Sequence, residues 1–353
     1  MKNVLIFLLS LVLNHGIFAQ IPNGYYDAAS GLNGTQLQQA LHNIIKNHTV
    51  VTYSSIWNHH EVTDKKPNGK VWDIYSDIPG GNPPYEFTFG ADQCGNYNSE
   101  GDCYNREHSF PSSWFGGTVT PMYTDLNHVF PTDGFVNSKR GNLPFGEVNS
   151  PTWTSMNGSR LGNNATAGYS GVVFEPIDAY KGDLARMHFY MATRYYGEDG
   201  NWPGSPAVDG AQMKQWTLTM LFDWHESDPV SAKEINRNNA IYSIQNNRNP
   251  FIDHPEYASL IWFYTSIDNE KSPKSSFSIY PNPAVDFLNI ECNNPGVSAT
   301  FTITDQAGRL LLSENLDGQE VKTIDISSLS GGFYLLSITE TNGQGAKTFK
   351  LIK

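Results

Sequence analysis

The sequence predicts an α+β protein with a large domain whose second half is helical, followed by a small all-β domain. Apolar residues recur at helical spacing in several segments, most clearly between residues 181 and 245. Beyond a polar stretch at 268–277, the pattern changes to short runs with period-two or buried-strand character, separated by Gly, Asn and Asp. At 353 residues, the chain is also longer than one typical domain.

The first 19 residues read as a cleaved secretory signal. Lys2 gives a basic start, an apolar run extends from Val4 to Leu13, and the small residue Ala19 ends the segment. A membrane anchor needs roughly 20 continuous apolar residues, whereas Asn14 interrupts this run. We therefore expect an exported protein with no stable membrane span, and we expect it to be a monomer.

The first part of the large domain, predicted over 20–267, mixes one helix with irregular segments. Residues 34–47 place Leu37 and Leu41 at helical spacing, with Thr35 available as a cap. Residues 50–90 are rich in Tyr, Trp, Pro and Gly, which favours strands and loops. From there to about residue 176 the periodicity is poor, as in segments that carry function on a rigid scaffold.

Helices are predicted again in the second half of this domain. Residues 181–196 and 213–226 carry apolar residues at helical spacing, and Ser231 with Glu234 forms a capping box at the start of a third helix. A linker is predicted at 268–277. The runs that follow, over 278–353, predict a small β-sandwich.

Charge and cysteines constrain the type of function. The net charge of −12 argues against a whole surface that attracts nucleic acid, because phosphate binding normally needs a basic face. Acidic groups that face away from a cleft would remove this objection. Of the three cysteines, Cys94 and Cys103 lie close enough in sequence to form one disulfide in an oxidising compartment, and Cys292 is far from both.

The segment 104–115, YNREHSFPSSWF, sets the carboxylate of Glu107 beside the imidazole of His108. On an extended strand the two side chains point to opposite sides, so they would do different jobs. Such a pair alone is weak evidence, because a hydrogen-bonded surface histidine is the commoner case.

A second segment, DLNHVFPTDGFVNSKRGNLPFGEV at 125–148, concentrates polar side chains among prolines and glycines. Phosphodiester hydrolysis needs an activated water, neutralised nonbridging oxygens and a stabilised leaving oxygen. A neutral histidine, an oxygen-ligated cation and one or two arginines can supply all three. A carboxylate and an amide oxygen suit Mg²⁺, with Mn²⁺ or Ca²⁺ as alternatives.

These two segments together resemble the bacterial endonuclease I family, exported nucleases with a ββα-metal (His-Me) finger. KGDLAR at 181–186 and QNNRNPFIDHPEY at 245–257 extend the resemblance. It implies that His108 activates water and that Glu107 and Asn137 bind the cation. The interval from His108 to Asn137 suits a strand, a loop and the start of a helix.

The resemblance also implies contacts with the phosphate backbone. Some relatives place an arginine between the two segments, but this chain has neither Arg nor Lys between Phe110 and Asp125. The role passes to another cation or is absent. The residues assigned to catalysis or substrate binding on this ground are Arg140, Lys139, Asn142, Arg186 and Arg248. Arg140 and Asn142 could alternatively hold the finger together. Arg248 could alternatively brace a loop.

Most other histidines and the tryptophans are expected to be structural. The histidines assigned to packing or hydrogen bonding are His59, His60, His128, His188, His225 and His254, of which His128 stands out because it lies inside the second motif. The series Trp57, Trp72, Trp114, Trp153 and Trp202 is more simply explained as core than as a sugar-stacking surface.

The C-terminal segment begins SIYPNPAVDFLNI at 278–290 and ends GGFYLLSITETNGQGAKTFKLIK. It resembles the sorting domain of the type IX secretion system, which implies export and contact with that machinery. A carbohydrate-binding sandwich, which would normally show exposed aromatic residues, is the alternative.

The sequence thus predicts a secreted, metal-dependent endonuclease acting on DNA, with RNA as an open alternative, and releasing 5′-phosphate ends. A nonhydrolytic surface adhesin or glycan-binding protein is the rival hypothesis, motivated by acidity and aromatic content. An inactive nuclease relative is disfavoured because the Glu, His and Asn positions are all filled.

Overall fold

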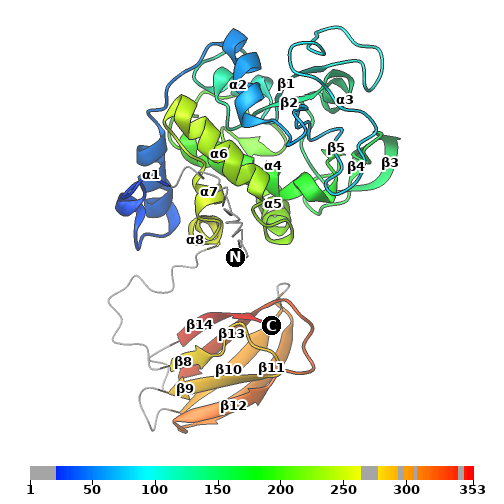
Figure 1. Ribbon diagram of the computed structural model, residues 1–353. Coiled ribbons are helices and arrows are strands. Elements are labelled where there is room, and N and C mark those ends of the chain that lie inside the picture. The colour runs from blue at the N-terminus through cyan, green and yellow to red at the C-terminus, as the bar shows by residue number, and fades with distance from the viewer. Residues whose placement is uncertain (1–20, 264–276, 293–297, 306–307, 341–345) are drawn as a thin grey trace, which may run out of the picture. The chain divides into compact units, whose positions relative to one another are not determined.

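The computed structural model describes residues 21–263, 277–292, 298–305, 308–340 and 346–353. The chain divides into two compact units, residues 1–264 and 265–353 (Figure 1). The predicted signal at 1–19 and nearly all of the predicted linker at 268–277 lie outside the described residues. The domain boundaries inferred from the sequence therefore stay predictions.

Helix α4 (Lys181–Arg194) forms the centre of the first unit, and every one of its residues is buried. Its apolar side chains, among them Leu184, Met187 and Met191, belong to the main hydrophobic cluster. Its charged side chains are paired, as a charge removed from water must be. Asp183 receives Lys233 at 2.6 Å, and Arg186 meets Glu234 at 2.5 Å.

The predicted helices are confirmed with small shifts at their ends. They are α1 (Gly34–Ile45), α4, α5 (Gln215–Ser227) and α6 (Ala232–Gln245), and two short helices follow, α7 (Pro250–Asp253) and α8 (Tyr257–Trp262). The capping box of Ser231 and Glu234 is present. The cap assigned to Thr35 is wrong, because α1 begins at Gly34 and the N-cap position is Asn33.

The expectation of strands and loops over residues 50–90 is wrong for its first part, which contains helix α2 (Ile56–Thr63). The buried residues of α2 are Ile56, His60 and Thr63, which stand at helical spacing. Two of the three are polar, so the apolar pattern did not reveal them. Within the same range, the segment VWDIYS at 71–76 has an alternating pattern that favours a strand, but it forms none. The chain turns there, and the carbonyl of Asp73 accepts from the amides of Ser76 and Asp77.

A strand, a second strand and a helix follow one another in the middle of the unit. Strands β1 (Tyr104–His108) and β2 (Val129–Asp133) pair antiparallel, with His108 opposite Val129, and α3 (Gly134–Arg140) begins where β2 ends. Figure 1 shows these three elements side by side. The Asp133 side chain caps α3 by accepting from the Val136 amide at 2.8 Å. This is the element order that the sequence predicted around the two motifs.

The poorly periodic region also contains a sheet that the sequence did not reveal. It consists of β3 (Val148–Thr154), β4 (Arg160–Asn164) and β5 (Val172–Glu175) in that order, and its pairing between β3 and β4 is interrupted by register shifts. A two-residue hairpin of β6 (Val208–Asp209) and β7 (Gln212–Met213) precedes α5.

The second unit contains β-strands alone within its described residues, which confirms the predicted all-β character. One sheet has the order β11 (Leu310–Asp317), β10 (Ser298–Thr304), β13 (Phe333–Glu340) and β14 (Ala346–Ile352), and the other has the order β12 (Val321–Asp325), β9 (Phe287–Cys292) and β8 (Phe277–Tyr280). Every second residue of β9 and β10 is buried, and these residues belong to one hydrophobic cluster.

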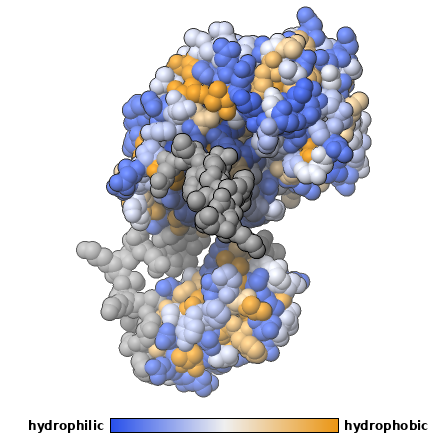
Figure 2. Space-filling view, in the orientation of Figure 1, coloured by the Kyte–Doolittle hydropathy of each residue, from blue (hydrophilic) through white to orange (hydrophobic). Residues whose placement is uncertain are grey.

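On the face seen in Figure 2, hydrophobic residues form separate patches among hydrophilic ones. Among the described residues, none of the helices has the length and apolar character that crossing a membrane requires.

Candidate active site

One surface pocket of about 170 Å³ brings the two sequence motifs together. Its lining comes from the end of β1, the loop that follows, and the C-terminal half of α3 with the turn beyond it. Four residues assigned to the site by sequence are in it, namely Glu107, His108, Asn137 and Asn142. Arg106, Pro111, Ser112, Ser113 and Gly141 complete the lining.

The ring of His108 is held in one orientation. Its Nε2 lies 2.9 Å from the carbonyl oxygen of Tyr123, and the Tyr123 ring stacks on it with 4.7 Å between centroids. Burial, with the nearby His128 as the next cause, lowers the pKa of His108 to about 3. The ring is therefore neutral at physiological pH. An Nε2–H that donates to Tyr123 leaves Nδ1 as the nitrogen that can accept a proton.

The Glu107 carboxylate is fixed from below by two donors. It is only 3% exposed, and its Oε1 accepts from Nη1 of Arg140 at 2.9 Å and from the Tyr75 hydroxyl at 3.1 Å. Burial raises the pKa of Glu107, while the Arg140 guanidinium acts in the opposite direction. Because both donors reach Oε1, Oε2 is left as the oxygen of Glu107 that can bind a ligand in the pocket.

Asn137 comes from α3 and faces the same pocket. Its Nδ2 donates to Oδ1 of Asn105 at 2.8 Å, and Asn105 precedes Glu107 by two residues on β1, so both belong to one side of the strand. This bond orients the Asn137 amide and leaves its Oδ1 as an acceptor. A carboxylate oxygen and an amide oxygen on one pocket suit a hard cation such as Mg²⁺ that keeps most of its water ligands.

The described part of the chain holds no group of three or more His, Cys, Asp or Glu residues arranged as a metal site. A cation bound by one carboxylate and one amide would not form such a group. Glu107 and Asn137 form a donor set that fits a hard cation in this pocket.

Arg140 lies beneath the pocket and does not line it. Its side chain is 0% exposed. Besides Glu107, it donates to the carbonyl oxygens of His108 at 3.0 Å and of Ser109 at 2.7 Å, and its guanidinium lies 4.5 Å from the centre of the Phe145 ring. These contacts favour the holding role over direct contact with a phosphate.

The remaining assigned cations lie outside the pocket. Lys139 is exposed on α3, with its ammonium 5.0 Å from the Phe135 ring centroid. Arg186 and Arg248 are almost fully buried in ion pairs with Glu234 and Asp253. The positions of Arg186 and Arg248 argue against contact with substrate, because each guanidinium is committed to a buried carboxylate.

Two groups of residues at the site escaped the sequence reasoning. Tyr75 and Tyr123 supply the hydrogen bonds that fix Glu107 and His108, and no local pattern marks either of them. Arg106 lines the pocket, and here a signal was available. On a strand, residues two apart share a side, so the assignment of His108 also placed Arg106 on the side of the general base.

Six histidines are expected from the sequence to be packed or hydrogen-bonded. Of these six, His60, His128, His188 and His225 are buried. His128, the exception within the motif, is packed 5.6 Å from the His108 ring centroid, and its Nε2 lies 2.6 Å from the carbonyl oxygen of Met122. Of the five tryptophans, Trp114 is buried in the core, and the other four are partly buried against hydrophobic clusters.

The loop before β1 is closed by a disulfide between Cys94 and Cys103, with Cα atoms 5.7 Å apart. Cys103 immediately precedes β1, and its carbonyl oxygen accepts from the amide of Gly134 at the start of α3 at 3.0 Å. The disulfide therefore anchors the point where β1 meets α3.

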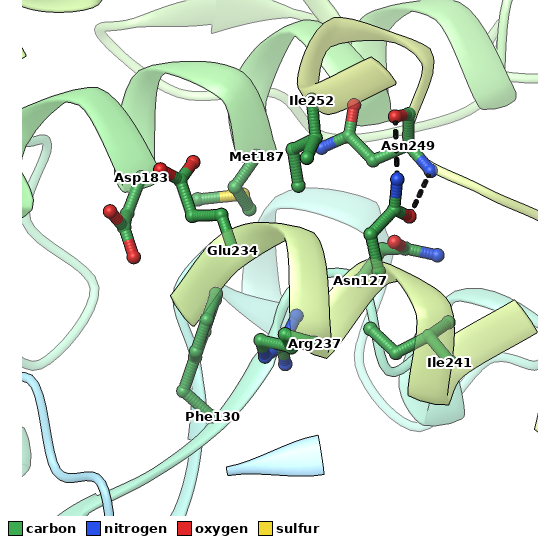
Figure 3. A pocket seen from close by; sticks show the side chains of 10 residues that line it. Asn127, Phe130, Asp183, Met187, Glu234, Arg237, Ile241, Asn249 and Ile252 are labelled. Carbon is green, nitrogen blue, oxygen red and sulfur yellow. Dashed lines mark hydrogen bonds between the residues drawn. The ribbon is translucent and has the colours of Figure 1, made fainter. Parts of the chain in front are cut away.

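A second cavity lies between α4 and α6 and is shown in Figure 3. Asp183 and Glu234 lie near one end of it and Asn127 and Asn249 near the other. Its volume of about 10 Å³ is room for about one water molecule. It is too small to take a substrate.

Comparison with known proteins gives two family matches. Residues 33–256 match the Endonuclease I family, and residues 278–353 match the secretion system C-terminal sorting domain. Extracellular ribonuclease of Bacillus amyloliquefaciens is 40% identical over 67% of this chain and 78% of its own, and the extracellular ribonuclease of Bacillus subtilis is 37% identical with the same coverage. Endonuclease-1 of Buchnera aphidicola subsp. Baizongia pistaciae is 27% identical over 36% of this chain and 46% of its own.

Proposed function

This chain belongs to the endonuclease I family, and we propose from that premise that it hydrolyses phosphodiester bonds of both DNA and RNA in the pocket at the end of β1. The chain is a secreted nuclease, exported through the type IX system that its C-terminal domain serves. The observation that carries the proposal is the convergence of Glu107, His108 and Asn137 on one pocket. The adhesin hypothesis has no comparable support.

Glu107 and Asn137 would hold one divalent cation, Mg²⁺ by preference and Mn²⁺ or Ca²⁺ as alternatives. Glu107 offers a carboxylate oxygen that neither Arg140 nor Tyr75 occupies, and Asn137 offers its amide oxygen. When bound, the cation supplies positive charge to the phosphate oxygens and to the leaving 3′ oxygen.

His108 would act as the general base. The lowered pKa of His108 means that the ring is neutral at physiological pH, with one ring nitrogen that can accept a proton. Its Nδ1 takes the proton from water, and the oxygen of that water forms a bond to phosphorus. The bond to the 3′ oxygen breaks, and this oxygen leaves as an alkoxide that takes a proton from solvent water. The Tyr123 carbonyl holds the ring at Nε2 and stabilises the positive charge that the ring acquires. The products carry a 5′-phosphate and a 3′-hydroxyl.

Attack by water makes no use of a 2′-hydroxyl, so this mechanism accepts RNA as well as DNA. The relatives at 37% and 40% identity are named ribonucleases, which supports RNA as a substrate. An enzyme that cyclised RNA through its 2′-hydroxyl would instead release 2′,3′-cyclic phosphates.

The test is a panel of Mg²⁺, Mn²⁺, Ca²⁺ and EDTA with the full chain on supercoiled plasmid, linear DNA and RNA. We expect cleavage of all three nucleic acids, no cleavage in EDTA, and 5′-phosphate ends in every case. Cleavage that persists in EDTA would remove the cation from the proposal. RNA products with cyclic phosphates would remove the water mechanism.

The variant His108→Ala should lose about 10²- to 10⁴-fold in turnover, the usual contribution of a general base. His254→Ala is the matched control, because His254 lies outside the pocket and its Nδ1 pairs with Glu256 at 3.1 Å. Equal plasmid cleavage by wild type and His108→Ala would refute the assignment.

A further inference from the structure

We propose that Arg106 is a catalytic residue of this pocket and binds the phosphate that is cleaved. The inference rests on the proposed function. It assigns the phosphate-binding cation that the two sequence motifs did not identify. Among the described residues that line the pocket, Arg106 is the one cationic side chain.

The position of Arg106 follows from the strand that carries it. Arg106 and His108 are two apart on β1, so their side chains leave the same side of the strand. Both line the pocket in which Glu107 and Asn137 also lie. A phosphate that comes within reach of His108 therefore meets Arg106.

The guanidinium is held in place before any substrate arrives. Its central carbon lies 3.6 Å from the centroid of the Tyr53 ring and 4.3 Å from that of Trp57. Its Nη1 donates to the carbonyl oxygen of Tyr53 at 2.7 Å. Two rings and one hydrogen bond thus fix the plane of the group, which lowers the entropy lost when it binds a ligand.

Most of its hydrogen-bonding capacity is left for a ligand. A guanidinium has five N–H donors, and the described contacts of Arg106 use one of them. Its Nε is buried and has no hydrogen-bond partner in the described part of the chain. The donors available to a phosphate in the pocket are therefore the N–H groups of the two terminal nitrogens that the bond to Tyr53 does not use.

Other cations near the motifs are not available for this role. Arg140 is fully buried and its donors point to Glu107 and two carbonyl oxygens, and Lys139 does not line the pocket. The whole chain carries a net charge of −12, so attraction of a polyanion must come from local charge. Arg106 provides that charge beside the general base, in a planar group that matches phosphate in two-point contact.

The test uses the full chain with Arg106→Gln and Arg106→Lys. We expect Arg106→Gln to lower kcat/KM on plasmid by about 10²- to 10³-fold, the usual loss for one transition-state donor. Arg106→Lys should recover only part of this loss, because an ammonium cannot make the two-point contact. The thermal midpoint of each variant shows whether it is folded, and Arg106→Lys carries the test if Arg106→Gln does not fold.

Binding of inorganic phosphate, measured by titration calorimetry without divalent ions, separates contact with phosphate from a structural role. Arg106→Gln should bind phosphate at least about tenfold more weakly than wild type, the equivalent of one charge-assisted contact. Lys46→Gln, which removes one positive charge outside the pocket, should bind phosphate like wild type. A folded Arg106 variant with wild-type affinity for phosphate overturns the inference, and so does a wild type that binds no phosphate. If wild type cleaves no nucleic acid, the proposed function fails while the titration still decides the role of Arg106.

Discussion

Replacing Arg140 by Met should weaken both the fold around the pocket and its affinity for a cation, although Arg140 does not line the pocket. The substitution leaves Glu107, which is 3% exposed, without its cationic partner, and it leaves two carbonyl oxygens without a donor. Removing one partner of a buried ion pair costs about 3–5 kcal/mol. We expect the free energy of unfolding of the first unit to fall by that amount.

The effect on the cation follows from the pKa of Glu107. Burial already raises that pKa, and the Arg140 guanidinium lowers it. Without Arg140 the carboxyl group holds a proton more strongly, and a protonated carboxyl group is a poor ligand. Loss of a group that orients a metal ligand typically costs about 10- to 100-fold in metal affinity. The Mg²⁺ concentration for half-maximal plasmid nicking should rise by that factor in Arg140→Met.

Two measurements on the full chain check this prediction. Tryptophan fluorescence in urea reports the first unit alone, because all eight tryptophans lie between Trp57 and Trp262. A Mg²⁺ titration of plasmid nicking reports the cation. Both are run on wild type and Arg140→Met, and Arg140→Lys replaces the latter if it does not fold.

Arg237→Met is a closely matched control. Arg237 is also buried, pairs with Asp64 at 2.8 Å and donates to the carbonyl oxygens of Leu126 and Val129. It should lose comparable stability while keeping the wild-type Mg²⁺ requirement. The reasoning is refuted if Arg140→Met unfolds at the wild-type urea concentration, or if its Mg²⁺ requirement matches that of Arg237→Met.

Two further predictions concern stability. The Cys94–Cys103 disulfide closes a short loop with a sequence separation of 9, for which a loss of roughly 2–3 kcal/mol is expected in Cys94→Ser/Cys103→Ser; an unchanged urea midpoint would contradict this. His188 is buried, and burial lowers its pKa to about 4. As pH falls below 6.5, the unfolded chain therefore takes up a proton at this histidine before the folded chain does. His188 thus lowers the free energy of unfolding between pH 6.5 and 4. Over that range, the free energy of unfolding of His188→Gln should rise relative to wild type by about 3 kcal/mol, at about 1.4 kcal/mol per pH unit. A difference in urea midpoint that does not vary with pH would show that His188 is not the titrating group.

The fold could be predicted where burial follows an apolar period. The helices at 34–45, 215–227 and 232–245 carry apolar residues or a capping box that local physics recognises. Helix α2 escaped because its buried side includes His60 and Thr63. The sheet of β3 to β5 escaped because the pairing of β3 with β4 is irregular and most residues of β3 are exposed, so β3 has no apolar alternation. In both cases tertiary packing, which a linear pattern does not contain, decides the structure.

The candidate site also contains residues of two kinds. Some can be predicted from their chemical type, and others are found only from the contacts they make in the folded chain. Glu107, His108 and Asn137 stand out in sequence because general bases and cation ligands come from few residue types. Tyr75 and Tyr123 act through a hydroxyl and a backbone carbonyl that reach the site from other segments. A backbone carbonyl has no sequence signature at all, so the tautomer of His108 that the mechanism needs is fixed by a contact that only the folded chain reveals.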